Sequence, residues 1–202
     1  VTNPPIDSLR EVGVMSLETC FGPELNIYEE SPTHAKRLVT TSPVLSYKKL
    51  QSLIKNPYFE VEEFELSFKD SISLEEAISS LKSKVVESVR GGNSIIHLIE
   101  EMPATGHLSI NALLAVGAVH QELVRLGLRS DANIVCTSSS ARDTHQIACL
   151  IGFGATAVYP TLAYQTILDL SARRELKGSA HENCARYRKG INKGLLKIIS
   201  KM

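Results

Sequence analysis

Side chains that could do acid–base chemistry stand at the end of one long apolar run. Glu100 and Glu101 directly follow SIIHLI, residues 94–99. Paired carboxylates can exchange protons with a substrate. Adjacent acids in a loop are also commonly only hydrated, so both interpretations stay open.

A second polar run follows the apolar stretch NIVCT, residues 133–137, and leads into a predicted helix. Hydroxyl groups and free amide groups at a helix start can hold a phosphate or a carboxylate. Ordinary helix capping is the alternative, and it needs only one serine. No serine has the GxSxG setting of a nucleophile elbow, so a Ser-His-Asp triad is poorly supported. The candidate anion-site residues are Ser138, Ser139, Ser140, Arg142 and His145.

Two further motifs give no cofactor or metal site. GFGA, residues 152–155, follows a predicted helix and precedes a strand, which reverses the order of a dinucleotide-binding fingerprint. Cys20, Cys136, Cys149 and Cys184 are widely separated, and no pair has CxxC or Cys/His ligand spacing. We therefore predict no metal ligands and expect reduced thiols of a cytoplasmic protein.

Composition narrows the class of protein. The chain has 202 residues, of which 43% are hydrophobic, with 22 basic and 22 acidic side chains. This suits one globular domain with a core of its own. The balanced charge argues against nucleic acid or a membrane surface as a partner. No apolar run approaches the roughly 20 residues that cross a bilayer.

The elements that must position these residues alternate between strand and helix. Strands are predicted at 64–68, 94–99, 133–137 and 155–159. Helices are predicted at 73–90, 109–126, 140–151 and 162–176, with Ser73 and Glu76 as a capping box. Two earlier helices are predicted, at 7–17 and 46–55. The alternation predicts an α/β fold of about four mostly parallel strands with helices on both faces, either Rossmann-like or a degenerate (β/α) barrel.

We divide the chain into three parts. Residues 1–60 form an irregular entry segment of helices and loops, and residues 61–180 form the α/β core. Residues 181–202 form a basic helical exit segment.

Several long motifs resemble one known family. They are VTNPPIDSLRE (1–11), HAKRLVTTSPVL (34–45), ALLAVGAVHQELVRLGLR (112–129), ARDTHQIACLIGFGATAVYPTLAYQTI (141–167) and YRKGINKGLLKIISKM (187–202). Together they cover nearly the full length, in order, and resemble the central domain of the large (alpha) subunit of bacterial glutamate synthase. The chain departs from the family at Leu98 to Glu101, where a Ser-Asp-Arg run is common, near Ser138, where an acid is common, and at Gln146, the second residue of a usual His-His pair.

The resemblance implies a connecting role without catalysis in this chain. A preceding glutaminase domain would release ammonia from glutamine, and a following FMN-binding barrel with a 3Fe-4S cluster would use the ammonia to make glutamate. The partners would be these two domains of the same polypeptide, with a small subunit or ferredoxin as electron donor, and FMN and the cluster would lie outside this chain. The segment at the N-terminus has a proline-fixed backbone and one amide side chain, which suits the wall of an ammonia channel, with a rigid interdomain connector as the alternative. The channel-wall candidates are Thr2, Asn3 and Ile6.

A different class of function stays open. The chain could be an independent α/β enzyme or a metabolite-binding domain with an anion site between Thr137 and His145.

Overall fold

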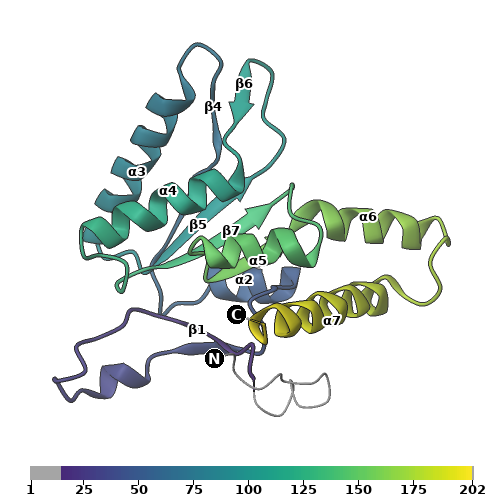
Figure 1. Ribbon diagram of the computed structural model, residues 1–202, viewed down its shortest axis with the longest axis horizontal. Coiled ribbons are helices and arrows are strands. Elements are labelled where there is room, and N and C mark those ends of the chain that lie inside the picture. Colours follow the sequence, from purple (N-terminus) through teal and green to yellow (C-terminus); the bar gives the residue numbers. More distant parts are fainter. Residues whose placement is uncertain (1–14, 202) are drawn as a thin grey trace.

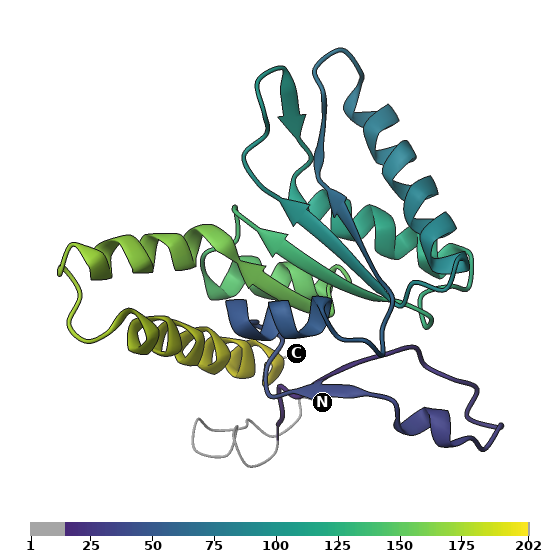
Figure 2. The same cartoon turned by 180° about the vertical axis from the view of Figure 1, so that it is seen from behind.

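The computed structural model describes residues 15–201, and these form one parallel sheet with helices on both of its faces (Figures 1 and 2). The strand order is β3-β5-β7-β8, and every neighbouring pair is parallel. The predicted α/β class, with about four parallel strands, is therefore confirmed, and the described residues form no closed barrel. The strands of this sheet are β3 (Val61–Glu65), β5 (Ile95–Glu100), β7 (Asn133–Ser138) and β8 (Ala157–Pro160).

Two small antiparallel pairs accompany the main sheet. β1 (Thr19–Phe21) pairs with β2 (Leu38–Thr40), and β4 (Ser67–Lys69) pairs with β6 (His107–Ser109). The helices are α2 (Tyr47–Ile54), α3 (Leu74–Arg90), α4 (Ala112–Arg125), α5 (Thr144–Gly152), α6 (Thr161–Ala172) and α7 (Ala180–Ile199), with a 3-10 turn, η1, at Pro32–Ala35.

The two faces of the sheet are covered by different elements. Ile96 and Ile134 point toward α3, α4 and α5 and belong to the larger core cluster. Ile95 and Val135 point the other way and pack with Phe21 and the apolar side of α2. Figures 1 and 2 show α6 and α7 as an antiparallel pair that extends from one end of the sheet. Successive strand residues thus serve separate cores, as a sheet buried on both faces requires.

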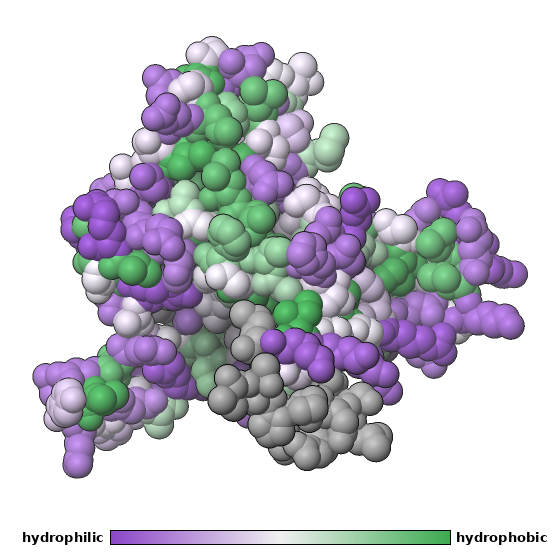
Figure 3. All heavy atoms as spheres, viewed as in Figure 1, coloured by the Kyte–Doolittle hydropathy of each residue, from purple (hydrophilic) through white to green (hydrophobic). Residues whose placement is uncertain are grey.

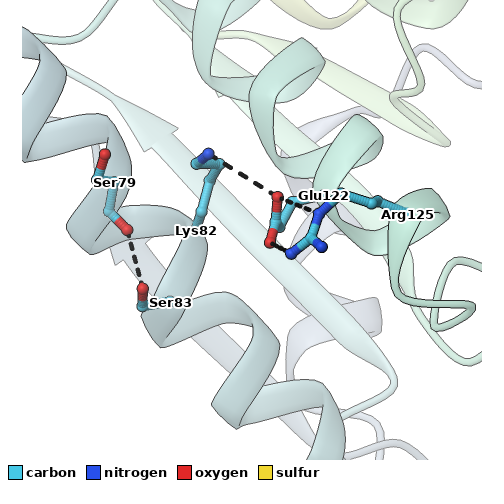
Figure 4. Close-up of polar contacts among 5 residues, drawn as sticks. All are labelled: Ser79, Lys82, Ser83, Glu122 and Arg125. Atoms are coloured by element: carbon cyan, nitrogen blue, oxygen red, sulfur yellow. Dashed lines mark hydrogen bonds and ion pairs between the residues drawn. The ribbon is translucent and has the colours of Figure 1, made fainter.

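Helix starts follow local signals. Ser73 accepts a hydrogen bond from the Glu76 amide and Glu76 reaches back to the Ser73 amide, so the predicted capping box opens α3. α3 and α4 then lie side by side and share an ion pair, with Lys82 Nζ 3.8 Å from Glu122 Oε2 (Figure 4). Arg125 also pairs with Glu122, and the Ser83 hydroxyl donates to the Ser79 carbonyl one turn away. Ion pairs that stay partly exposed to solvent contribute little, so apolar packing holds these helices together.

Several predicted boundaries are wrong for identifiable reasons. The strand predicted at 64–68 breaks at Leu66, whose carbonyl accepts from the Ile110 amide. The helix predicted from residue 109 starts at Ala112, because Asn111 caps it and the preceding residues pair with β4. The last helix of the core ends at Ala172 rather than near residue 176, since Arg174 takes the left-handed conformation with φ of 60°.

The N-terminal part was predicted less well. The helix predicted at 7–17 lies mostly outside the described residues, and its described end, Met15 to Leu17, is not helical. The stretch 21–45, whose three prolines indicate loops with one short strand, holds β2 and only the last residue of β1. The channel-wall candidates Thr2, Asn3 and Ile6 also lie outside the described residues.

Candidate functional site

The carboxyl ends of β5 and β7 meet at one edge of the sheet. Glu100 is opposite Ser138 in the register of these two strands. Ligands of open α/β sheets bind at this edge, so these residues are the first candidates for chemistry.

Glu100 is buried, with 4% of its surface exposed, and it accepts four hydrogen bonds. Oε1 accepts from the Ala112 amide at 2.9 Å, in the first turn of α4. Oε2 accepts from the Ser138 hydroxyl at 2.7 Å, from the Ser140 amide at 3.0 Å and from the Ser140 hydroxyl at 2.8 Å. The carboxylate therefore ties the end of β7 to the start of α4.

The ionisation of Glu100 follows from these contacts. Burial acts to raise its pKa, but the hydrogen bonds from Ser138, Ala112 and Ser140 favour the carboxylate and bring the pKa below its ordinary value. A sealed carboxylate with a low pKa neither donates nor takes up protons near neutral pH. Of the two acids considered for catalysis, Glu100 is thus an internal structural anion, and Glu101 is exposed.

The residues predicted to bind an external anion separate into two groups. Ser138 and Ser140 both donate to Glu100, so the anion that these hydroxyls hold is part of the chain itself. The helix predicted from residue 140 starts at Thr144 instead. Its cap is Asp143, which forms a capping box with Gln146, and Ser140 does not cap it. Ser139 makes no hydrogen bond within the described residues, and Arg142 and His145 are exposed.

A small cavity of about 240 Å³ lies beside this group, between α4 and α5. Ser140 and His145 both line it, together with Asn111 and Cys149. Cys149 Sγ lies 3.7 Å from His145 Nε2. An external anion at this place stays a prediction.

A second polar group occupies the opposite face of the sheet. His97 lies in an apolar stretch, which indicates a core histidine with a hydrogen-bond partner, but the sequence does not identify the partners. His97 is 3% exposed; its Nδ1 lies 2.8 Å from Glu63 Oε1 and its Nε2 lies 2.7 Å from the Thr137 hydroxyl. Because a carboxylate only accepts, Nδ1 carries the proton of the neutral ring and the hydroxyl donates to Nε2. The order carboxylate, imidazole, hydroxyl is that of a nucleophilic triad, but Thr137 is only 4% exposed and closed to a substrate.

Burial sets the protonation of His97. It lowers the pKa of the ring, and the hydrogen bond and charge of Glu63 oppose this without cancelling it. Strand register places the pair, since Glu63 and His97 are directly opposite. No spacing along the chain predicts this pair. The usable signal was a polar residue inside each of two apolar strands, His97 in β5 and Thr137 in β7.

All four cysteines are free thiols, and they differ in burial. Cys20 is exposed, Cys136 is buried, and Cys149 and Cys184 are half-buried. No three His, Cys, Asp or Glu side chains of residues 15–201 converge as metal ligands. The described residues therefore do not fit a three-iron cluster. Among the described helices, none combines the length and apolar character needed to cross a membrane.

Comparisons with known proteins agree with one another. The family model described as "Glutamate synthase central domain" matches residues 1–202. Similar proteins include the glutamate synthase [NADPH] large chain of Azospirillum brasilense (38% identity), ferredoxin-dependent glutamate synthase 2 of Arabidopsis thaliana (36%) and glutamate synthase [NADH] of Saccharomyces cerevisiae (31%). Each comparison covers 100% of this chain but only 14%, 13% and 10% of the relative, respectively. The chain belongs to the glutamate synthase central domain family.

Proposed function

We propose that this chain is the connecting domain of a glutamate synthase and has no catalytic role of its own. The parent reaction converts glutamine, 2-oxoglutarate and a reductant into two molecules of glutamate. The observation that carries the proposal is the family match along the full chain. It is supported by the carboxyl ends of β5 and β7, where the described residues make no catalytic carboxylate available. There the buried carboxylate Glu100 is saturated by donors of this chain and is unavailable to a substrate.

The partners are the other domains of the same polypeptide. The relatives are seven to ten times longer than this chain, as their 10–14% coverage implies. We propose a glutaminase domain on one side and an FMN-binding barrel with a 3Fe-4S cluster on the other, with a small subunit or ferredoxin supplying electrons. The proposed location is the cytoplasm.

The proposed contribution to function is a wall of the ammonia channel. Ammonia is small and neutral, and it becomes protonated or escapes if it meets bulk water. A channel therefore needs a closed wall with few hydrogen-bonding groups. Thr2, Asn3 and Ile6 are the residues proposed for it, and the support is the family resemblance of their segment.

The test uses the complete polypeptide and compares glutamine hydrolysed with glutamate formed. Replacing Asn3 or Ile6 by Trp should leave glutamine hydrolysis running while less glutamate is formed per glutamine. Tyr28→Trp is the matched control, since Tyr28 is 89% exposed. Unchanged coupling in both channel variants would refute the channel role.

One observation favours the alternative function, the cavity of about 240 Å³ beside Ser140 and His145. If the chain binds a metabolite anion there, phosphate or 2-oxoglutarate should bind saturably to the complete polypeptide, and His145→Ala should weaken that binding. Unaltered affinity in His145→Ala would remove this alternative.

A further inference from the structure

The two edges of the parallel sheet differ. The outer edge of β8 is covered by the segment 43–45: the Leu45 amide donates to the Val158 carbonyl at 2.9 Å, and the Val158 amide donates to the Pro43 carbonyl at 2.8 Å. β3 forms the other edge, which Figure 2 shows on the side of α3. Within residues 15–201, the chain therefore covers the β8 edge by backbone pairing but not the β3 edge.

The alternation of backbone directions along β3 identifies the N–H and C=O groups that face away from β5. The Glu60 carbonyl accepts from the β5 side, and the Leu66 amide donates to the Ile99 carbonyl. Since backbone groups alternate along a strand, even-numbered residues of β3 face β5 and odd-numbered residues face outward. The outward residues are Val61, Glu63 and Glu65. Within residues 15–201, no hydrogen bond from their backbone reaches another segment across this edge.

A groove of about 390 Å³ runs along this edge, between β3 and α3. Phe64, Phe68 and Leu81 line its apolar part, and all three are buried. An added strand needs free backbone groups for pairing and pockets for alternate side chains. The β3 edge offers both.

The charge at the groove is acidic. Glu63 and Glu65 line it and are exposed, and Lys84 is the basic residue among its lining. Glu63 Oε1 already accepts from His97, so Glu65 is the acid that remains for a partner. Acidic side chains on a free edge also prevent unwanted pairing, which is the competing explanation. The two explanations differ in one measurable respect. A paired edge protects its outward amides from hydrogen exchange with water, and a free edge does not.

We propose that an extended segment from the remainder of the polypeptide pairs with β3 as an additional strand, with Lys or Arg facing Glu65 and apolar side chains in the groove. The inference rests on the proposed function in one respect, that this chain is one domain of a longer polypeptide. Complementary charge fixes the register of such a strand, and the apolar pockets hold it.

Residue-resolved hydrogen exchange of the complete polypeptide tests the pairing. The Glu62 and Phe64 amides face β5 and serve as the internal reference for a folded strand. The expected result is that the Glu63 and Glu65 amides are slowed at least a hundredfold relative to an unstructured peptide. Exchange of these two amides at the unprotected rate, with Phe64 still protected, would overturn the inference.

Two charge reversals test the occupant. Glu65→Lys should speed exchange of the Glu63 amide at least tenfold, whereas the matched reversal Glu87→Lys, on the exposed side of α3, should leave it unchanged. Equal behaviour of the two variants would refute the basic segment. Protection that rises with protein concentration would also refute it, because the occupant would then be a second copy. None of these readouts uses glutamine turnover, so failure of the channel proposal and failure of this one are separable.

Discussion

Replacing Glu100 tests whether an internal anion holds the sheet edge together. Glu100→Gln keeps the shape but has only one oxygen. If the Gln oxygen faces Ser138 and Ser140, the Gln NH2 group faces the backbone N–H of Ala112. Two donors then face each other, and the buried Ala112 N–H loses its acceptor. An unsatisfied buried donor costs about 1–3 kcal/mol, and loss of the charge weakens the remaining bonds. We expect a total loss of about 2–4 kcal/mol.

Glu100→Ala removes the acceptor of all four hydrogen bonds. The Ser138 and Ser140 hydroxyls lie 3.2 Å apart and can still pair with each other, so part of the loss is recovered. We expect about 3–5 kcal/mol, comparable to breaking other buried charged networks. The control is Glu101→Gln, the exposed neighbour, which should change stability by less than about 0.5 kcal/mol.

Equilibrium urea unfolding, followed by circular dichroism, measures these differences. The pH dependence supplies a second readout. Because the folded pKa of Glu100 lies below its ordinary value of 4.5, its contribution is complete above that value and is lost as pH falls through the folded pKa. Glu100→Gln should therefore flatten the acid side of the stability profile. A loss below about 1 kcal/mol in Glu100→Gln, with an unaltered acid profile, would refute the reasoning.

Three further predictions follow from buried or crowded positions. Burial lowers the pKa of His97 below 6.5, so the unfolded chain gains a proton first and stability is lost as pH falls below that value; His97→Gln should flatten this slope in urea titrations. Gly154→Ala should cost about 2–4 kcal/mol, since φ is +116° and the new Cβ would overlap the side chain of His120. Gly190→Ala, with open space in α7, should stabilise by about 0.5–1 kcal/mol in thermal unfolding. Burial raises the pKa of the Cys136 thiol, so a thiol reagent should label it only on unfolding, whereas Cys20 reacts in the folded protein; rapid labelling of Cys136 would contradict its burial.

Local signals explain what the sequence could predict. The start of α3 was predicted because Ser73 and Glu76 satisfy each other within one turn. The strands β5 and β7 were predicted because sheets buried on both faces need nearly continuous apolar runs. Each of these features depends on residues close together in the chain.

Contacts between distant segments explain what the sequence could not predict. Ser140 stands where a helix cap is expected, but Glu100, forty residues earlier, takes its amide and hydroxyl. Asp143 then caps α5 in its place. The His97–Glu63 pair likewise depends on the register of β3 against β5, which no local pattern fixes.

Sequence periodicity also only partly predicts which apolar side chains are buried. Helical spacing predicts Leu74 as part of the buried stripe of α3, yet it is 43% exposed. Figure 3 shows apolar side chains gathered on the surface over α4 and the β4–β6 pair. Leu108 and Leu114, from β6 and α4, are among the exposed apolar residues. Periodicity identifies an apolar side but not whether anything covers it.

The pairing of segment 43–45 with β8 has a consequence for synthesis on the ribosome. Val44 meets Val158, so more than a hundred residues must leave the exit tunnel before this edge can close. Until then Leu45, which is fully buried in the finished fold, lacks the Val158 carbonyl to which its amide donates. Because non-local pairing is slow to form, completion of the sheet is expected only after β8 has emerged. A nascent chain halted before Val158 should accordingly be cleaved by protease near residue 45, and one halted well beyond it should resist.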